Sequence, residues 1–311
     1  MCRKMIQILL ATYNSRTFLA EQLDSLLTQE NSCDIEILIS DGGSNDNTLE
    51  IIEDFKKRYP GKIRFLGSRP ASACQNFIRL ISAADSELIM FCDHDDVWKK
   101  DKVRLSVEAY RKMEQQYGAD MPLLIFTDSE VVDSKLKKCY SSMMRSQRLN
   151  MTRFTPGRTI IQNYASGNTM LFNRALQKIV LPVGNNAVMH DHWTALAASF
   201  FGKVCYVDVP TIYYRQHGKN VLGAFQYNFF SCLKKFIYES GQFRGALYRD
   251  LDQASEFLSL HKDQLTSEQQ KLLAGLEHFK EMPWLGRCRF LIKHDILKAG
   301  ILRNIGMFLN I

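Results

Sequence analysis

Residues 88–98 read LIMFCDHDDVW, an apolar run that leads directly into three aspartates and a histidine. The run LIMFC is typical of a strand that is buried on both faces. Buried carboxylates are costly unless they are paired or bind a metal ion. Asp93 and Asp95, two residues apart in an extended turn, can share a divalent ion such as Mg²⁺ or Mn²⁺. Alternatively, Asp95 or Asp96 caps a following helix. A cap explains one acid but not three, so we favour the metal and expect His94 to make local hydrogen bonds.

Short apolar runs alternate with segments of helical period over the first two-fifths of the chain. The predicted strands are residues 6–10, 35–40, 63–66, 88–92 and 123–129. A segment of helical period follows each of the first four strands. This alternation, with strands that are almost entirely apolar, predicts an α/β fold in which helices cover both faces of a mostly parallel sheet.

Polar segments follow three of these strands: ATYN, SDGGSND and CDHDD. In parallel sheets ligands bind outside the carboxyl ends of the strands, so we expect the three segments to meet at one edge. Asp41 can accept N–H groups from a nucleobase, but a glycine-rich turn with an Asx cap explains the same residues. Thr12 and Asn14 can likewise be simple turn formers.

Two later segments carry further candidate groups. Asp191, in MHDHWTAL, can act as a general base for a hydroxyl nucleophile or as a helix N-cap, and the residue types alone do not decide between them. The H-D-H spacing does not place both imidazoles on one helix face, so a zinc site is discounted. In YRQHGKN, Arg215 and Lys219 can grip a diphosphate and His217 can complete a metal shell, although a solvated basic turn has the same composition.

Composition and missing motifs argue against several classes of protein. A net charge of +7 suits nucleic acid, an anionic membrane or an anionic substrate. No RNA-binding or zinc-finger motif and no dense basic block is present, which argues against nucleic acid. Eight cysteines without a C-x-x-C spacing favour a reduced, cytoplasmic compartment. The absence of a P-loop, a G-x-G-x-x-G segment and a serine elbow argues against kinases, dehydrogenases and serine hydrolases.

The second half of the chain is predicted to change character. The segment 204–217 reads as a strand, a proline-marked turn and a second strand, and the chain is predicted to be helical from about residue 224. Residues 221–238 come nearest to a membrane-spanning length, but polar residues interrupt them. On a single helical wheel drawn from residue 287, the basic residues spread around the axis. Packing against the catalytic domain and peripheral contact with the inner face of the plasma membrane therefore both remain open.

With these motifs in order, the chain resembles the family 2 glycosyltransferases of GT-A fold over about residues 5–224. The segments DHDDVWKKDK, QNYASGNTM, MHDHWTALAASFFGK and PTIYYRQHGKNVLGA are most similar to bacterial rhamnosyltransferases of cell-wall or capsular polysaccharide synthesis. The resemblance implies a GT-A domain over residues 1–223 and a C-terminal helical region over residues 224–311. It also implies Mg²⁺ or Mn²⁺ and an inverting transfer of a sugar, L-rhamnose from dTDP-rhamnose, to a lipid-linked saccharide. Relatives that use another nucleotide sugar remain an alternative.

The resemblance assigns roles to individual positions. It implies that the donor is bound by Thr12, Tyr13, Asn14, Asp41, Asn76, Asp93 and Arg215. The metal ligands would be Asp93, Asp95 and His217, and Asp191 would deprotonate the acceptor hydroxyl. The acceptor side would be formed by Gly167, Asn168, Thr169 and Trp193, with Trp193 as a surface for sugar stacking. The chain differs from the common pattern at Gly42, where relatives often carry a second aspartate, and at His94, where they often carry glutamine.

Two other classes of protein are alternatives to a glycosyltransferase. A nucleotidyltransferase shares the alternating fold and the acidic metal site, but it would bring a glycine-rich basic loop after the first strand, which ATYNSRTF lacks. A non-catalytic nucleotide- or saccharide-binding module would not need a base at Asp191. A retaining transferase with a carboxylate nucleophile is the mechanistic alternative.

Overall fold

The computed structural model describes residues 5–30, 33–151, 154–217 and 240–311. These residues form two compact units. The first unit comprises residues 5–143, 165–181 and 201–217, and the second comprises residues 144–164, 182–200 and 240–311. The predicted domain boundary at 223/224, the apolar segment 221–238 and Lys219 lie outside the described residues, so the interpretations placed on them stay predictions.

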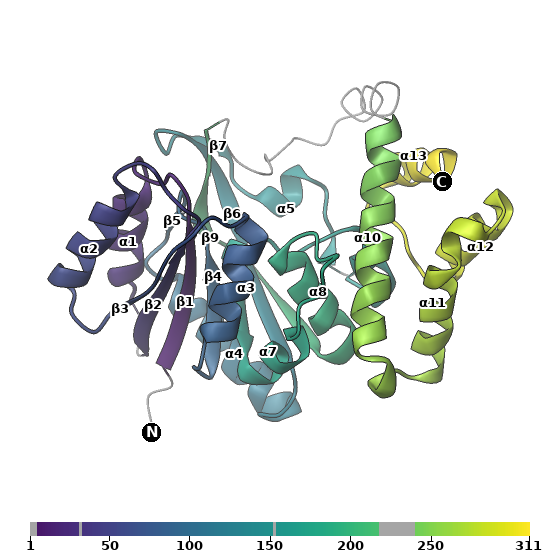
Figure 1. Cartoon of the computed structure of the whole chain (residues 1–311), viewed down its shortest axis with the longest axis horizontal. Helices are drawn as coiled ribbons and strands as arrows, with labels where there is room; N and C mark the ends of the chain where they lie inside the picture. The colour runs from purple at the N-terminus through teal and green to yellow at the C-terminus, as the bar shows by residue number, and fades with distance from the viewer. Residues whose placement is uncertain (1–4, 31–32, 152–153, 218–239) are drawn as a thin grey trace. The chain divides into compact units, whose positions relative to one another are not determined.

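A mixed sheet forms the centre of the first unit (Figure 1). Its strand order is β3-β2-β1-β4-β8-β6-β9-β5, and β7 pairs with β6. The strands are β1 (Met5–Thr12), β2 (Asp34–Asp41), β3 (Ile63–Ser68), β4 (Leu88–Cys92), β5 (Val97–Trp98), β6 (Leu123–Asp133), β7 (Lys138–Tyr140), β8 (Met170–Asn173) and β9 (Lys203–Gln216). The helices of this unit are α1 (Leu19–Leu27), α2 (Thr48–Arg58), α3 (Ala73–Ala83), α4 (Lys102–Tyr117), η2 (Gly167–Thr169) and α7 (Arg174–Val180).

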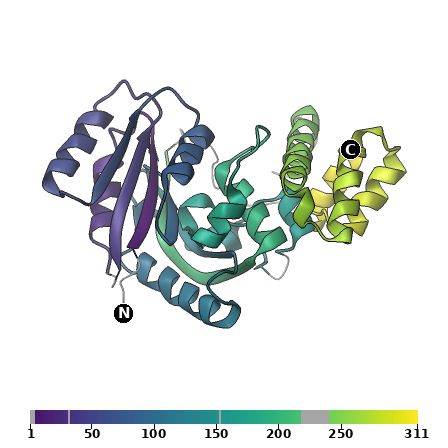
Figure 2. The ribbon, with the colours of Figure 1, turned by 60° about the horizontal axis from the view of Figure 1, so that its bottom comes forward.

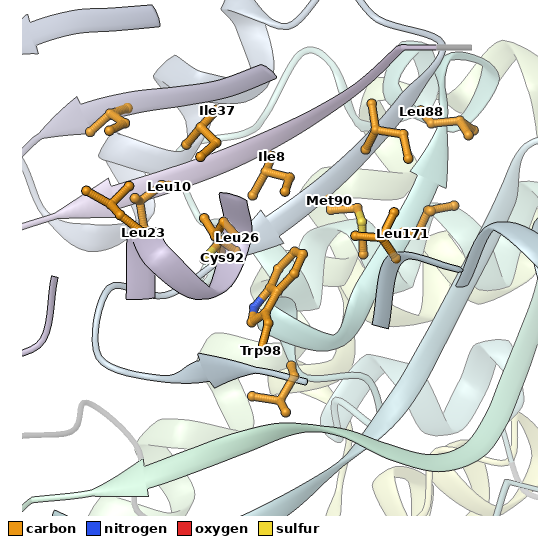
Figure 3. Close-up of a cluster of buried hydrophobic side chains, with 14 of the residues drawn as sticks. Ile8, Leu10, Leu23, Leu26, Ile37, Leu88, Met90, Cys92, Trp98 and Leu171 are labelled. Carbon is orange, nitrogen blue, oxygen red and sulfur yellow. The ribbon is translucent and has the colours of Figure 1, made fainter. Parts of the chain in front are cut away.

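Alternating apolar side chains divide the sheet into two buried faces. Ile8, Ile37 and Met90 belong to the core cluster that also includes residues of α1, α2 and α4 (Figure 3). On the opposite face, Phe91 meets Phe77 of α3 edge to face at 5.5 Å between ring centroids. Figure 1 and Figure 2 show the sheet between these helices. Because both faces are covered, the strands are apolar at nearly every position, as predicted.

The ends of three parallel strands lie together, which confirms the expectation from the polar segments. β1 pairs in parallel with β2 on one side and with β4 on the other. Thr12 pairs with Asp41, and Leu10 pairs with Cys92. The chain therefore leaves all three strands at the same edge of the sheet.

One strand makes the sheet mixed, and another differs from the prediction. β8 lies between β4 and β6 and is antiparallel to both. The segment predicted as two strands with a turn at Pro210 is the single strand β9, which runs parallel to β6. Its register shifts on either side of the Asp128–Pro210 pair. A bulge accommodates the proline, which has no N–H for the ladder, so the strand does not turn.

The second unit consists of helices. They are α6 (Pro156–Ile161), α8 (His190–Phe201), α10 (Ser240–Leu260), η3 (Lys262–Gln264), α11 (Ser267–Glu277), η4 (Phe279–Glu281), α12 (Trp284–Lys293) and α13 (Ile301–Asn310); α5 (Met143–Ser146) begins at its border with the first unit. Within the described residues, no helix has both the length and the apolar composition needed to cross a membrane.

The basic and apolar segment from residue 287 onward is two helices, so the single helical wheel used for it was wrong. α12 ends at Lys293 and α13 begins at Ile301. Asp295 and Gly300, between them, have φ of +51° and +95°, which a helix cannot continue through. Asp295 also forms an ion pair with Arg158 at 2.9 Å. The faces of α12 and α13 must therefore be considered separately.

Candidate active site

The acidic loop, residues 93–96, leaves β4 at the edge where β1 and β2 also end. Asp95 and Asp96 are buried and Asp93 is half-buried. The loop continues into β5, and α4 begins only at Lys102, with Asp101 at its N-cap position. Asp95 and Asp96 therefore do not cap a helix, and the alternative explanation for the acidic cluster is excluded.

Asp96 lies at the base of the acidic loop and is held by two donors. Its Oδ1 accepts a hydrogen bond from the backbone N–H of Arg215 at 3.0 Å, and its Oδ2 accepts one from the side chain of Asn168. Burial, and then repulsion from Asp95 and Asp93, raise the pKa of Asp96 well above its ordinary value. The loop therefore concentrates more negative charge than its own surroundings neutralise.

A buried lysine contributes to the surroundings of the acidic loop. The Nζ of Lys102 lies 4.6 Å from the ring centroid of Trp98 and makes no hydrogen bond within the described residues. Burial lowers the pKa of Lys102 to about 7, an effect that Cys92 and Asp96 partly oppose. The lysine charge is thus only weakly maintained at neutral pH, and Lys102 compensates the carboxylates incompletely.

Asp95 interacts with a residue that follows β9, more than one hundred positions further along the chain. His217 follows β9, and its Nε2 lies 2.8 Å from Oδ2 of Asp95. The imidazole also packs on the ring of Phe18 at 5.0 Å between centroids. The two side chains thus interact directly, and their joint binding of a metal ion stays a prediction.

Arg215 ties the acidic loop to distant elements and is almost fully buried, with 2% of its surface exposed. Its Nε donates to the carbonyl of Asp95 at 2.9 Å, its Nη1 donates to the carbonyl of Ser134 at 2.7 Å, and its Nη2 pairs with Glu21. The guanidinium also lies 4.4 Å from the ring centroid of Phe18. These bonds use three of the five guanidinium N–H groups and give Arg215 a positioning role. A contact of Arg215 with a diphosphate stays a prediction.

Asp41 organises the turn after β2. Its carboxylate is fully buried and accepts hydrogen bonds from the hydroxyls of Thr12, Ser44 and Ser68 and from the backbone N–H groups of Gly43 and Ser44. Burial alone would raise the pKa of Asp41, but the hydrogen bonds from Ser44, Ser68 and Thr12 outweigh it and lower the pKa. This arrangement is the glycine-rich Asx turn considered as an alternative, and a contact of Asp41 with a nucleobase stays a prediction.

Different structural constraints favour glycine at the two glycine positions of this turn. Gly43 has φ of +88°, a conformation that glycine adopts readily. Gly42 has an ordinary backbone, but a Cβ there would lie 3.1 Å from the carbonyl oxygen of Ala71. This close approach accounts for glycine at the position where relatives often have aspartate.

The other predicted donor-binding residues at this edge divide into buried and exposed groups. Asn76 is buried and bonds to Ser40 at 2.6 Å and to the carbonyls of Ser40 and Thr12 at 3.0 and 3.3 Å. Tyr13 and Asn14 are exposed, and Asn14 has φ of +47°. Asn76 and Thr12 thus help to fix the turns, and so does the exposed Asn14, whose Oδ1 accepts the N–H of Asn45 at 3.0 Å. The side chain of Tyr13 is exposed.

Asp191 lies in the second unit, within the first turn of α8. The first helical bond runs from the N–H of Trp193 to the carbonyl of Met189, so Met189 occupies the N-cap position. The N-cap alternative for Asp191 is therefore wrong. Its carboxylate is half-buried, accepts the N–H of His192 at 2.7 Å, and lies at the positive end of the helix dipole.

The residues beside Asp191 belong to the core of the second unit. Burial lowers the pKa of His190 to about 3 and that of His192 to about 4. His192 lies 2.6 Å from the carbonyl of Thr159 through Nε2, which must therefore donate, and Nδ1 accepts from Gln253 at 3.2 Å. The ring bonds of His192 are thus made within the core, in agreement with the discounted zinc site.

Trp193 does not form the predicted surface for sugar stacking. Its side chain is 0% exposed, and its ring packs edge to face on Phe257 of α10 at 5.2 Å. Sequence periodicity did not reveal this contact, because α10 lies about sixty positions further along the chain. Trp193 is a core residue of the second unit, and we do not assign it to the acceptor.

The remaining predicted acceptor residues form η2, immediately before β8. Gly167, Asn168 and Thr169 are all buried. Asn168 bonds to Asp96, and the hydroxyl of Thr169 donates to the carbonyl of Ser166 at 2.6 Å. These contacts place η2 against the acidic loop, and a contact with the acceptor stays a prediction.

The acidic loop fits a divalent cation in its chemistry. Among the described residues, no three or more histidine, cysteine, aspartate or glutamate side chains are close enough together to form a complete metal site. Asp95 and His217 nevertheless converge, and Mg²⁺ is often held by one or two protein ligands with substrate phosphates and water completing the shell. A cation beside Asp93 and Asp95 would also relieve the repulsion that raises the pKa of Asp96.

Comparison with known proteins establishes the class of protein. A family model described as glycosyl transferase family 2 matches residues 7–180. The chain belongs to this family, and it is a glycosyltransferase of GT-A fold. The structure is similar to that of residues 1–349 of TarS from S. aureus in complex with UDP-GlcNAc, with a TM-score of 0.56, 16% identity, and coverage of 94% of this chain and 88% of that one.

Three proteins of similar sequence are glycosyltransferases or take part in polymer synthesis, according to their names. The chain is 31% identical over 228 residues to the dTDP-rhamnosyl transferase RfbG of Shigella flexneri, an alignment that covers 69% of this chain and 74% of the relative. It is 27% identical over 223 residues to an uncharacterized glycosyltransferase of Nostoc, which covers 69% of this chain and 66% of the relative. It is 25% identical to the minor teichoic acid biosynthesis protein GgaA of Bacillus subtilis over 56% of this chain and 40% of the relative.

Two residues that the sequence analysis did not single out, Phe18 and Glu21, contact the side chains around the acidic loop. Phe18 lies under both His217 and Arg215, and Glu21 pairs with Arg215. They are three residues apart at the start of α1, so both can face the same side. The only local signal is this spacing, and it does not indicate a partner nearly two hundred residues away.

We expect replacement of Arg215 to destabilise the first unit. Arg215→Met leaves the carbonyls of Asp95 and Ser134 without their donor and should lower the free energy of unfolding by about 3 kcal/mol in urea titrations. Arg104→Met is the matched control, because Arg104 forms exposed ion pairs only, and its effect should stay within about 0.5 kcal/mol. An Arg215→Met protein with the unfolding midpoint of the parent would contradict the positioning role.

Proposed function

We propose that this glycosyltransferase moves L-rhamnose from dTDP-rhamnose to a hydroxyl of a growing, lipid-linked bacterial surface polysaccharide, with inversion at the anomeric carbon. The main observation that supports dTDP-rhamnose as the donor is the 31% identity to a dTDP-rhamnosyl transferase over 74% of that relative. The similarity to a teichoic acid biosynthesis protein supports a cell-surface polymer as the product. The family assignment alone supports transfer and does not specify the sugar.

In the proposed reaction, the acceptor oxygen attacks the anomeric carbon while the bond from that carbon to the diphosphate oxygen breaks. Asp191 takes the proton of the acceptor hydroxyl. No covalent intermediate with the protein forms. Tyr13 and Asn14, which are exposed where β1 ends, would contact the donor.

Asp95 and His217, with Asp93 beside them, would hold Mg²⁺ or Mn²⁺, which when bound supplies positive charge for the departing diphosphate. Asn168 and the backbone of Arg215 hold Asp96, and the guanidinium of Arg215 holds the carbonyl of Asp95. These bonds fix the loop that presents the ligands. Such preorganisation matters because a misplaced ligand loses much of its effect on the reaction.

A donor screen tests the proposal. Purified protein with Mg²⁺ or Mn²⁺ and a lipid-linked saccharide fraction should release nucleoside diphosphate from dTDP-rhamnose and not from a panel of UDP- and GDP-sugars. The product anomer, read by NMR, should be inverted relative to the donor. Release from a UDP- or GDP-sugar alone would favour the second candidate, a family 2 transferase with another donor. Donor binding without release under all these conditions would favour a binding module.

We expect Asp191→Asn to abolish turnover and to keep donor binding. An amide cannot accept the hydroxyl proton, so kcat should fall by about 10³-fold while the Kd for dTDP, measured by calorimetry, stays within about twofold. Asp263→Asn, at an exposed site in the same unit, is the control and should retain full activity. A rate near that of the parent in Asp191→Asn would show that another group is the base.

We expect Asp95→Ala to weaken the metal site directly. Loss of a charged ligand should weaken Mn²⁺ binding at least about tenfold, measured by electron paramagnetic resonance without donor, and should lower kcat by about 100-fold. Asp120→Ala removes an exposed carboxylate of the same unit and should change neither quantity. Full activity of the parent protein in excess EDTA would contradict the metal dependence.

A further inference from the structure

Exposed apolar side chains gather on two helices of the second unit. Among the described residues, seven of the thirteen exposed large hydrophobic side chains lie on α12 and α13. We call these residues the C-terminal apolar surface: Trp284, Leu285, Ile292, Ile301, Leu302, Ile305 and Leu309. Scattered exposed apolar residues are normal, but a concentration of this kind marks a surface that something covers.

α13 directs its apolar side chains outward. Ile301, Ile305 and Leu309 recur every four residues, so they form one stripe, and they are 79%, 49% and 62% exposed. Met307 and Asn310, on the other side of the helix, are buried. The helix is therefore held by one face and leaves its isoleucine and leucine stripe to solvent.

α12 is fixed to α13. The indole N–H of Trp284 donates to the carbonyl of Phe308 at 2.9 Å, next to Leu309. α13 is also tied to α10, because Nε of Arg244 donates to the carbonyl of Asn310 at 2.9 Å. The start of α12 is thus held against the end of α13.

Positive charge accompanies this surface. Leu285, Arg289, Ile292 and Lys293 lie on one face of α12 by their spacing, and all four are exposed. Residues 284–310 contain five arginines and lysines and one acid. That acid, Asp295, forms an ion pair with Arg158, and neither helix contains an acidic residue. Along α12 and α13, basic side chains therefore accompany the exposed apolar ones, and acidic side chains do not.

We propose that the C-terminal apolar surface docks on the interfacial region of an anionic lipid bilayer. Aliphatic side chains would enter the headgroup boundary, and Arg289 and Lys293 would meet the lipid phosphates. Trp284 is typical of such boundaries, where one end of the indole is apolar and the other makes hydrogen bonds. A second copy of this chain is a poorer occupant, because a two-fold contact would bring together two surfaces of the same positive sign. The inference is independent of the donor and of the reaction.

Vesicle flotation of the full chain tests the proposal. The protein should float with vesicles of phosphatidylglycerol and phosphatidylcholine in equal parts, float much less with phosphatidylcholine alone, and be released by high salt. The triple variant Ile301→Ser, Ile305→Ser and Leu309→Ser should lower the partition coefficient at least about tenfold. Its control is Val188→Ser, Val209→Ser and Leu260→Ser, which changes three other exposed apolar residues and should float like the parent.

A second variant separates loss of docking from loss of folding. Arg289→Gln with Lys293→Gln removes charge from α12 without touching α13 and should reduce flotation with the anionic vesicles only. Unfolding midpoints close to that of the parent support a direct effect in both variants. Flotation of the triple variant at the level of the parent would overturn the proposal. So would light scattering that shows a parent dimer dissociating in the triple variant, since the surface would then join two copies.

Discussion

The burial of Asp96 and Asp95 at the end of a core strand is the constraint on which the first unit depends. Carboxylates in that position are tolerated only where donors reach them, and those donors come from distant parts of the chain. Asn168 precedes β8, and the N–H of Arg215 belongs to β9. The strand order β4-β8-β6-β9 is what brings both to the loop. The same strand β9 carries the guanidinium to α1, where Glu21 and Phe18 receive it.

This arrangement separates two kinds of residue at the sheet edge. Thr12, Asp41 and Asn76 are buried and bonded to one another or to nearby backbone, so they shape the turns. Tyr13 is exposed, and the exposed Asn14 accepts the N–H of Asn45 through its Oδ1. Many residues of the sequence motifs therefore shape the backbone at this edge of the sheet. Residues that position others in this way are common around functional sites.

The sequence was sufficient for those features that depend on local pattern. Apolar runs located all five predicted strands, and the rule that parallel strands end at one edge brought together the segments after β1, β2 and β4. The sequence was insufficient for features that depend on pairing between segments far apart along the chain. The insertion of β8 and the continuity of β9 through Pro210 depend on pairing with other strands, which no short window contains. The resemblance assigns Trp193 to the acceptor, whereas its burial depends on Phe257, far along the chain.

The antiparallel entry of β8 has a consequence for how this fold can vary. The parallel strands β1, β2 and β4 deliver their last residues to the functional edge, whereas β8 delivers its first ones, since it runs the opposite way. Residues 165–169, which lead into β8, therefore lie at that edge. A change of sequence there can alter the edge without shifting the pairing of β8 with β4 or β6.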